Sequence, residues 1–167
     1  MPGFELIGEE ERQAVNELFN DGGVLFAHGF DEMRNNRYHV REFEKEFANY
    51  IGVKYAQAVS SGTAALKIAL VALGVKPGDE VITQAFTFVA TAEAIIDIGA
   101  KPVFVNINKT LNMDPVALEF AITDRTSAII PVHMLGVAAE QDEIHAIARK
   151  HDIPILDDAC ESLGAEW

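Results

Sequence analysis

Residues 77–107 read PGDEVITQAFTFVATAEAIIDIGAKPVFVNI, and this stretch decides the fold class. Two short runs of β-branched and apolar residues, Glu80–Thr83 and Pro102–Ile107, have the composition and length of strands. Between them, the residues near Thr87–Ile98 have the length of a helix, and Gly99 provides a C-terminal stop. The stretch therefore predicts a strand, a helix and a second strand, which is the unit that connects parallel strands.

The same alternation continues from Lys54 to the last residue. It predicts further strands at Tyr55–Val59, Ala128–Val132 and Ile153–Leu156, and further helices near Thr63–Leu73, Asp114–Ile122 and Glu140–His151. Strands that alternate with helices in this way indicate the α/β class, with a mostly parallel sheet and helices on both faces. Ligands of such sheets bind outside the carboxyl ends of the strands, so the residues that follow each strand are the candidates for a site.

The first 53 residues follow a different pattern and predict a helical N-terminal arm. Apolar residues at helical spacing indicate one helix over Glu9–Asp21. A second apolar stripe begins at Val40 and ends at Ile51, with Gly52 as the expected C-cap. We therefore expect a helical arm over residues 1–53 and an α/β portion over residues 54–167.

Composition excludes several classes of protein. The chain has 167 residues and a net charge of -13, which argues against a nucleic-acid partner because phosphate binding needs cations. Its single cysteine, Cys160, excludes an intrachain disulfide and a cysteine-based zinc site, and we expect no metal. The N-terminal residues are acidic where a secretion signal is basic, and no apolar run is long enough to span a membrane. A cytoplasmic protein without a membrane partner is the expectation.

The turn Ser60-Ser61-Gly62-Thr63 is the first candidate site, because it opens a predicted helix. Free backbone N–H groups and the helix dipole at such a start favour an anion, and Gly62 allows close approach of a phosphate. Ordinary N-capping by a hydroxyl side chain is the alternative explanation. Phe88, which follows another strand, is a candidate for stacking on a ring, although an aromatic residue at a helix start is more often part of the core.

Asp157 and Asp158 follow the last predicted strand and are the second candidate site. Carboxylates at the exit of a buried strand are costly unless they meet a cation, a metal or a hydrogen-bonding ligand. Alternation along a strand directs the two side chains to opposite faces, so only one of them can face a given ligand. A phosphotransfer or hydrolase domain that holds Mg²⁺ with this pair is a weaker alternative, because no P-loop or nucleophile elbow accompanies it. His133 also follows a strand, without an evident partner.

Six motifs occur in an order and spacing that resemble one family. They are SGTAAL (61–66), PGDEVI (77–82), FTFVAT (86–91), GAKPVFV (99–105), IIPVH (129–133) and LDDACESLGA (156–165). Together they resemble the DegT/DnrJ/StrS family of pyridoxal-phosphate-dependent sugar aminotransferases, from about Phe43 to the last residue. This resemblance implies part of the large domain of the aspartate-aminotransferase (type I) fold, with the C-terminal part of the family fold outside this sequence.

The resemblance also assigns roles around a pyridoxal 5'-phosphate cofactor. Gly62, Thr63 and Ala64 would hold the phosphate, and Phe88 would stack on the pyridine ring. Asp158 would pair with the protonated ring nitrogen, which keeps the ring an electron sink. The positive ring would also offset the desolvation of this acid.

Two features depart from the family pattern. Glu161 stands near the expected ring hydroxyl, where the family usually has Gln or His. The family's Schiff-base lysine corresponds to a position beyond Trp167, and the chain's seven lysines all precede Asp158. We therefore expect no catalytic lysine in these residues and no turnover by this chain alone.

The resemblance implies a complete enzyme that transfers an amino group from glutamate or glutamine to a keto sugar, commonly nucleotide-linked, in polysaccharide biosynthesis. It also implies a homodimer. One alternative is a sugar dehydratase of the same family, in which His replaces the lysine. Another alternative is a non-catalytic, truncated module for binding or dimerisation.

Overall fold

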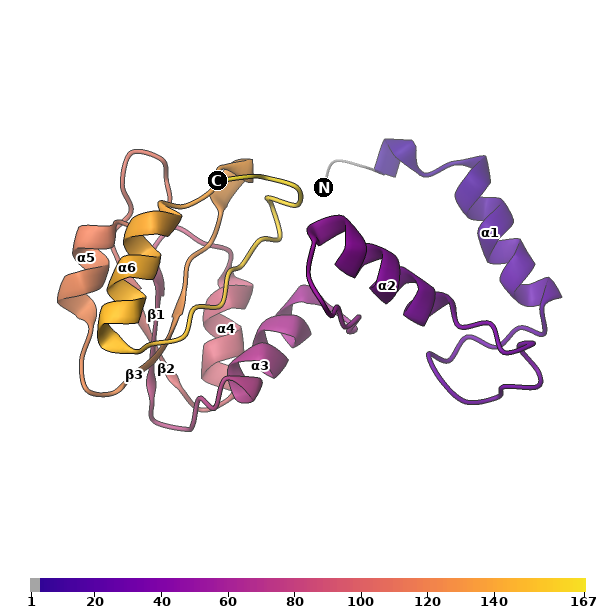
Figure 1. Cartoon of the computed structure of the whole chain (residues 1–167), viewed down its shortest axis with the longest axis horizontal. Coiled ribbons are helices and arrows are strands. Elements are labelled where there is room, and N and C mark those ends of the chain that lie inside the picture. Colours follow the sequence, from indigo (N-terminus) through magenta and orange to yellow (C-terminus); the bar gives the residue numbers. More distant parts are fainter. Residues whose placement is uncertain (1–3) are drawn as a thin grey trace. The chain divides into compact units, whose positions relative to one another are not determined.

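The structure, a computed structural model, describes residues 4–167 (Figure 1). The chain divides into two compact units, of which the first ends at Ala58 and the second spans Val59–Trp167. Each unit is described by itself. From Phe4 to Trp167, no helix is both long enough and apolar enough to cross a membrane.

The first unit is helical. A short 3-10 helix, Phe4–Leu6, precedes α1 (Glu9–Asn20) and α2 (His39–Ile51). Gly52 follows α2 in the left-handed conformation with a φ of 77°, as expected for a glycine C-cap. Both predicted helices of the arm are therefore confirmed.

The second unit is built on a parallel sheet. Its strands are β1 (Glu80–Gln84), β2 (Lys101–Val105) and β3 (Thr126–Ile130), in the order β2-β1-β3. Residues 155–158 extend this sheet beside β3 through isolated parallel bridges, Ile129 to Ile155 and Val132 to Asp158.

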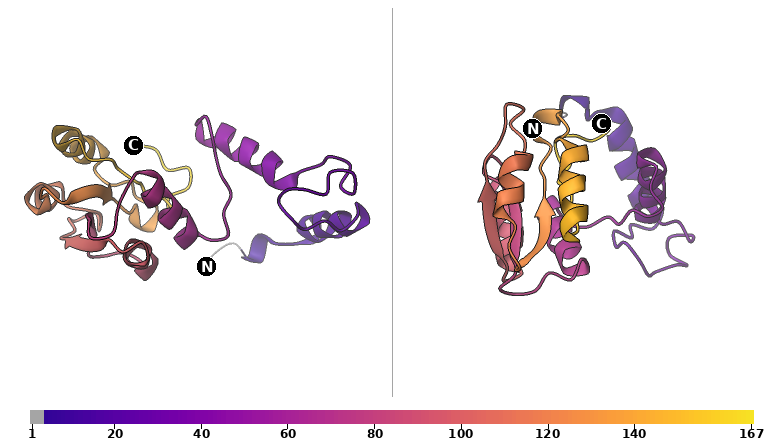
Figure 2. Two further views of the ribbon diagram at one scale, coloured as in Figure 1. Left: turned by 90° about the horizontal axis from the view of Figure 1, so that it is seen from below. Right: turned by 60° about the vertical axis from the view of Figure 1, so that its left-hand side comes forward.

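Helices cover both faces of this sheet (Figure 1, Figure 2). They are α3 (Gly62–Ala72) and α4 (Val89–Asp97) on one face, and α5 (Pro115–Ala121) and α6 (Gln141–His151) on the other. Side-chain alternation divides each strand between two cores: Val81 packs with residues of α3 and α4, whereas Ile82 packs with residues of α5 and α6. The predicted α/β class with helices on both faces is confirmed.

The prediction of a strand at Tyr55–Val59 is wrong. A strand needs a neighbour for its backbone N–H and C=O groups, and no described segment pairs with these residues. Instead, the Glu44 carboxylate of α2 accepts hydrogen bonds from the Ala58 backbone N–H (2.9 Å) and the Gln57 side-chain amide (2.7 Å). A side chain of the arm thus replaces a sheet partner.

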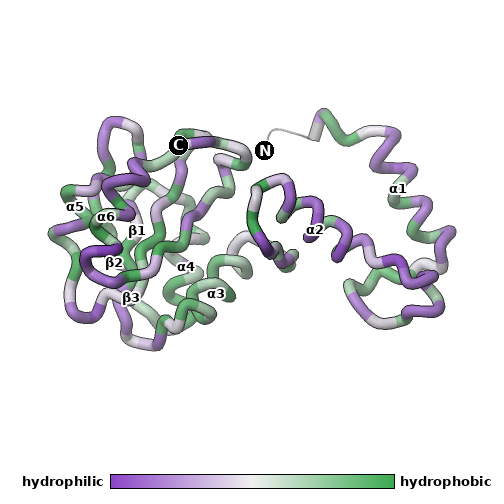
Figure 3. Tube along the Cα trace, in the orientation of Figure 1, coloured by the Kyte–Doolittle hydropathy of each residue, from purple (hydrophilic) through white to green (hydrophobic). Residues whose placement is uncertain are grey.

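The helices of the two units differ in hydropathy. Helices α3 and α4 are mostly hydrophobic, whereas α1 and α2 carry many hydrophilic residues (Figure 3). Helices packed between a sheet and their neighbours bury more of their circumference than helices with one covered face. The second unit accordingly contains nearly all of the described core.

Candidate functional site

The starts of two helices lie at the carboxyl edge of the sheet. Helix α4 connects the parallel strands β1 and β2, so it begins where β1 ends. Helix α3 packs along α4, and the ammonium of Lys67 pairs with Asp97 at the end of α4 (2.9 Å). The turn after α3 joins the loop after α4 through a hydrogen bond from Gly78 N–H to the Gly99 carbonyl (2.8 Å). Both helices therefore run opposite to the strands, with their N termini at the carboxyl edge.

The start of α3 offers unpaired backbone donors. The Ser61 hydroxyl accepts a hydrogen bond from Ala64 N–H (3.1 Å), so the ordinary capping role is present. Within residues 4–167, the N–H groups of Gly62 and Thr63 have no acceptor. A Cβ added at Gly62 would meet no atom within 4 Å, so the space in front of this helix start is open. The turn can accept an anion without rearrangement of its cap.

Asp158 is the buried acid at this edge, with 8% of its surface exposed. Its Oδ2 accepts a hydrogen bond from the Thr91 hydroxyl (2.9 Å), and from residues 4–167 its Oδ1 receives only a long one from Cys160 N–H (3.4 Å). Among residues 4–167, no Lys, Arg or His forms an ion pair with it. A buried carboxylate without a cation suits a positively charged ligand, and a protonated pyridine ring fits this requirement.

Asp157 faces the opposite side of the sheet, as strand alternation predicts. Its Oδ1 accepts a hydrogen bond from the Gln141 amide of α6 (3.0 Å) and lies 3.2 Å from His133 Nε2. Burial raises the pKa of Asp157, but the hydrogen bonds from His133 and Gln141 outweigh burial and hold that pKa below its ordinary value. Asp157 and Asp158 thus have separate surroundings and do not form one magnesium site.

His133 has a partner that the sequence did not reveal. Its buried Nδ1 accepts a hydrogen bond from Ala139 N–H (3.0 Å), so in the neutral ring the proton is on Nε2. That nitrogen faces the Asp157 carboxylate, and His133 N–H donates to the carbonyl of Asp158 (3.1 Å). The histidine therefore joins the end of β3 to the segment that carries both acids.

Phe88 lies at the N-cap position of α4, and 70% of its surface is exposed. The alternative that it is a core residue is therefore wrong. An exposed aromatic ring at the carboxyl edge is available for stacking on a planar ligand.

Glu161 holds the loop that follows β3. Its Oε2 accepts a hydrogen bond from Leu135 N–H (2.8 Å), and Leu135 is in the left-handed conformation with a φ of 56°. One oxygen of Glu161 is therefore used inside the chain.

Cys160 lies next to Glu161 in the sequence. Burial and the neighbouring Asp158 raise the pKa of the Cys160 thiol to about 11, so this cysteine is not an activated nucleophile.

Gln84, at the end of β1, holds the loops around the carboxyl edge together, and the sequence analysis did not predict this role. It is fully buried, and its Oε1 accepts hydrogen bonds from the N–H groups of Met113 (3.0 Å) and Val132 (3.1 Å). Its amide donates to the carbonyls of Phe86 (3.0 Å) and Leu111 (3.2 Å). The sequence feature that could have predicted this role is a polar residue directly after the apolar residues of a strand. Gln84 fixes the loops that surround the carboxyl edge.

Asn112 has a similar role one loop away. It is fully buried, its Oδ1 accepts from Met134 N–H (2.9 Å), and its amide donates to the carbonyl of Val137 (3.0 Å). The loop after β3 is thereby held against the loop after β2.

Comparison with known proteins identifies the relatives of this chain. The profile of the DegT/DnrJ/EryC1/StrS aminotransferase family matches residues 7–167. The chain belongs to this family. It is 53% identical over 129 residues to the UDP-2-acetamido-2-deoxy-3-oxo-D-glucuronate aminotransferase of Pseudomonas aeruginosa, an alignment that covers 77% of this chain and 36% of that enzyme.

Solved structures of relatives agree with the fold. The chain superimposes on 3-amino-5-hydroxybenzoic acid synthase with a TM-score of 0.89 and 38% identity, covering 99% of this chain and 41% of the other. It superimposes on GDP-4-keto-6-deoxymannose-3-dehydratase, solved with a trapped PLP-glutamate geminal diamine, with a TM-score of 0.82 and 34% identity, covering 96% and 41%. The fold is thus part of the type I fold of pyridoxal-phosphate enzymes, and the family cofactor is pyridoxal phosphate. The chain spans about two fifths of the length of these relatives.

Proposed function

We propose that this chain is the cofactor-binding portion of a pyridoxal-phosphate-dependent aminotransferase that acts on a keto sugar, commonly nucleotide-linked. The observation that supports it most is Asp158, a buried carboxylate without a cation at the edge where α3 begins. Pyridoxal phosphate supplies an electron-withdrawing ring that stabilises negative charge on the substrate carbon. Glutamate or glutamine is the proposed amino donor of the complete enzyme.

The phosphate is assigned to the start of α3. The free N–H groups of Gly62 and Thr63, with the Thr63 hydroxyl, are its proposed donors. Ala64 contributes less directly, because its N–H donates to Ser61. Because a Cβ added at Gly62 would meet no atom within 4 Å, the backbone there is open to a phosphate.

The ring is assigned to the space beside Phe88 and Asp158. Phe88, whose ring is exposed, would stack on the pyridine ring, and the buried Asp158 would accept a hydrogen bond from the protonated ring nitrogen. Glu161 would meet the ring hydroxyl with the carboxylate oxygen that does not accept from Leu135 N–H. This last role requires that the hydroxyl donates, because a carboxylate only accepts.

A titration with pyridoxal phosphate, followed by absorbance, tests the proposal. Asp158→Asn removes the charge that the ring nitrogen needs, and we expect at least a tenfold loss of affinity. Asp157→Asn is the matched control, because the neighbouring acid faces α6, and it should bind as the wild type does. Equal affinities of the two variants would refute the site.

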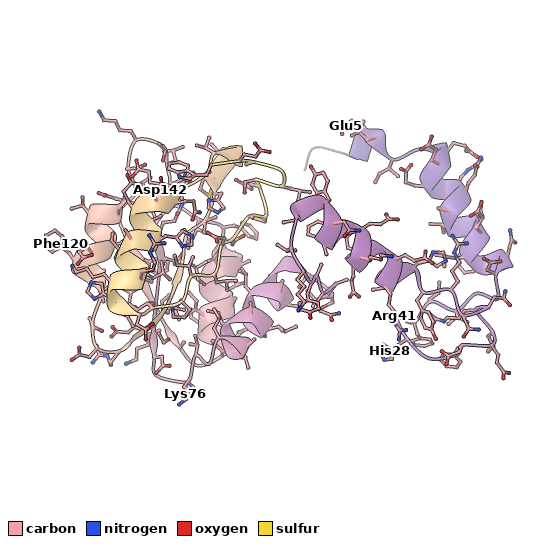
Figure 4. All side chains as sticks on the ribbon, in the orientation of Figure 1. Glu5, His28, Arg41, Lys76, Phe120 and Asp142 are labelled. Carbon is pink, nitrogen blue, oxygen red and sulfur yellow. The ribbon has the colours of Figure 1, made fainter. Side chains whose placement is uncertain are left out.

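We further propose that the 167 residues bind the cofactor without turnover. Lys67 and Lys150 are engaged with Asp97 and Glu119, and Lys76 lies in the turn before β1 at the amino edge of the sheet (Figure 4). A covalent lysine that also moves the proton is needed for transamination. Amino-sugar formation by this chain with donor, keto sugar and cofactor, at an enzymatic rate, would contradict this.

A sugar dehydratase is the second candidate, favoured by the structural similarity to GDP-4-keto-6-deoxymannose-3-dehydratase. The two activities require different residues at the position that bonds to the cofactor. Reading the coding sequence downstream of Trp167 separates them: a lysine there supports the aminotransferase, and a histidine supports the dehydratase.

The complete protein is proposed to be a cytoplasmic homodimer. Many apolar side chains of the first unit, such as Phe19 and Phe26, are largely exposed, which suits an interface. The lone cysteine suits a reducing compartment. A single monomer mass in light scattering at high concentration would refute the dimer.

A further inference from the structure

Of the two hydrogen bonds that the described residues donate to the Asp158 carboxylate, the one from Thr91 is the shorter. Thr91 lies in the first turn of α4 with 1% of its surface exposed, and its hydroxyl is 2.9 Å from Asp158 Oδ2. Thr87, one helical turn earlier, places its own hydroxyl 3.0 Å from that of Thr91. Two hydroxyls and one carboxylate thus form a continuous chain across α4 and the last sheet segment.

The direction of these hydrogen bonds follows from the donor inventory. An ionised carboxylate only accepts, so Thr91 must use its single proton on Asp158. The oxygen of Thr91 is then free to accept from Thr87, whose other acceptor among residues 4–167, the Phe88 carbonyl, is more distant at 3.4 Å. The chain therefore runs from Thr87 to Thr91 to Asp158, and each donation polarises the next.

The two oxygens of Asp158 consequently have unequal surroundings. Oδ2 holds the 2.9 Å hydrogen bond from the Thr91 hydroxyl, and this hydroxyl is shielded from water because Thr91 is buried. Within the described part of the chain, Oδ1 has only the long contact with Cys160 N–H. Rotation of the carboxylate would break the strong bond, so Oδ1 is the oxygen left for a ligand.

We propose that Thr91 is a positioning residue that orients the Asp158 carboxylate toward the ring nitrogen of pyridoxal phosphate, with Thr87 supporting it. This inference rests on the proposed function, since it assumes that the ring nitrogen meets Asp158. It assigns to the FTFVAT motif a function besides presenting Phe88. Neither hydroxyl touches the cofactor in this arrangement.

Ligand pairs that differ at one atom test the proposal in the 167-residue chain. Affinities are measured for pyridoxal phosphate and for its 1-deaza analogue, in which CH replaces the ring nitrogen. Thr91→Val keeps the shape and removes the hydroxyl, so pyridoxal phosphate should bind about tenfold more weakly while the analogue is unaffected. Thr91→Ser restores the hydroxyl and should bind within about twofold of the wild type.

Thr87→Val is the second variant and removes only the supporting hydroxyl. We expect about a twofold loss for pyridoxal phosphate and none for the analogue, because the bond from Thr91 to Asp158 remains. Circular dichroism checks that each variant is folded. If Thr91→Val is unfolded, the serine and Thr87→Val variants still test the proposal through the same pair of ligands.

The outcomes separate this inference from the proposed function. Equal losses for both ligands in Thr91→Val, or no loss for either, would overturn the positioning role while the wild type still prefers pyridoxal phosphate. If the wild type binds both ligands equally and Asp158→Asn changes neither, the proposed function fails, and the role of Thr91 fails with it.

Discussion

The arm and the α/β unit differ most in how much they bury. Of the side chains from Glu5 to Ala58, only those of Arg34 and Ala48 are buried, whereas the second unit has a hydrophobic core on each face of its sheet. Both regions show clear amphipathic periodicity, yet Phe43 on α2 remains 55% exposed. Periodicity therefore predicts a helix and its apolar side, but does not show that the same unit covers that side.

Arg34 illustrates how the arm holds itself together. Its guanidinium donates to the Phe26 carbonyl (2.5 Å) and lies over the Tyr38 ring, which Arg41 also contacts. Polar and cation–π contacts of this kind contribute less than a packed core. The arm thus has less buried apolar surface to stabilise it than the α/β unit has.

The largest expected effect is in the core, and it tests the contrast directly. Ile82→Ala removes a fully buried side chain in the middle of β1 and should lower the free energy of unfolding by about 3 kcal/mol. Phe43→Ala in the arm should cost less than about 1 kcal/mol, because its ring is already exposed. Urea denaturation of both variants provides the measurement. Similar losses would show that the arm is as well packed as the sheet.

A smaller effect is expected from the buried amide of Gln84. Gln84→Met keeps the length of the side chain but leaves two backbone N–H groups without an acceptor, which should cost about 2 kcal/mol. Gln57→Met in the arm is the matched control, and because Gln57 is exposed we expect a change within about 0.5 kcal/mol. Calorimetry gives the melting temperatures of the two variants. Equal temperatures would contradict the expectation that the buried amide of Gln84 contributes more to stability than the exposed amide of Gln57.

The smallest effect concerns pH. The pKa of Asp157 is lower in the folded state, so its contribution is present above the unfolded value of about 3.9 and is lost as pH falls through the folded value. Asp157 is partly exposed, and the contribution should be under about 1 kcal/mol. Asp157→Asn should therefore lose less stability than the wild type between about pH 5 and pH 3. Parallel pH curves of unfolding free energy for the two proteins would refute this role.

Local features of the sequence were enough for most of the second unit. Gly99 ends a helix and Asp114 caps one before Pro115, as predicted, because these effects depend on residues only a few positions apart. The alternation of side chains along a strand also predicted correctly that Asp157 and Asp158 face opposite sides of the sheet. The strand expected at Tyr55–Val59 failed because strand formation depends on a partner, and composition carries no information about which segment supplies one.

Some features of the candidate site were also predictable from the sequence, and others were not. Sequence reasoning proposed Asp158, Phe88 and the start of α3 as site residues, because they follow apolar runs or open a helix. It did not find the contact between Thr91 and Asp158, which are 67 residues apart, or the contact between His133 and Asp157. Such contacts arise only when separate crossover units align their carboxyl ends.

The amino-acid sequence by itself determined the order of β1, β2, β3 and the helices between them, the alternation of side chains along a strand, and the family to which the motifs belong. Periodicity, capping and turn chemistry act over a few residues, and they can be recognised without a structure. Only the tertiary structure decided which apolar faces are covered, which oxygen of Asp158 remains available, and which buried amides hold the surrounding loops. These properties depend on contacts between distant segments, whose geometry is set by how helices pack on both faces of one sheet.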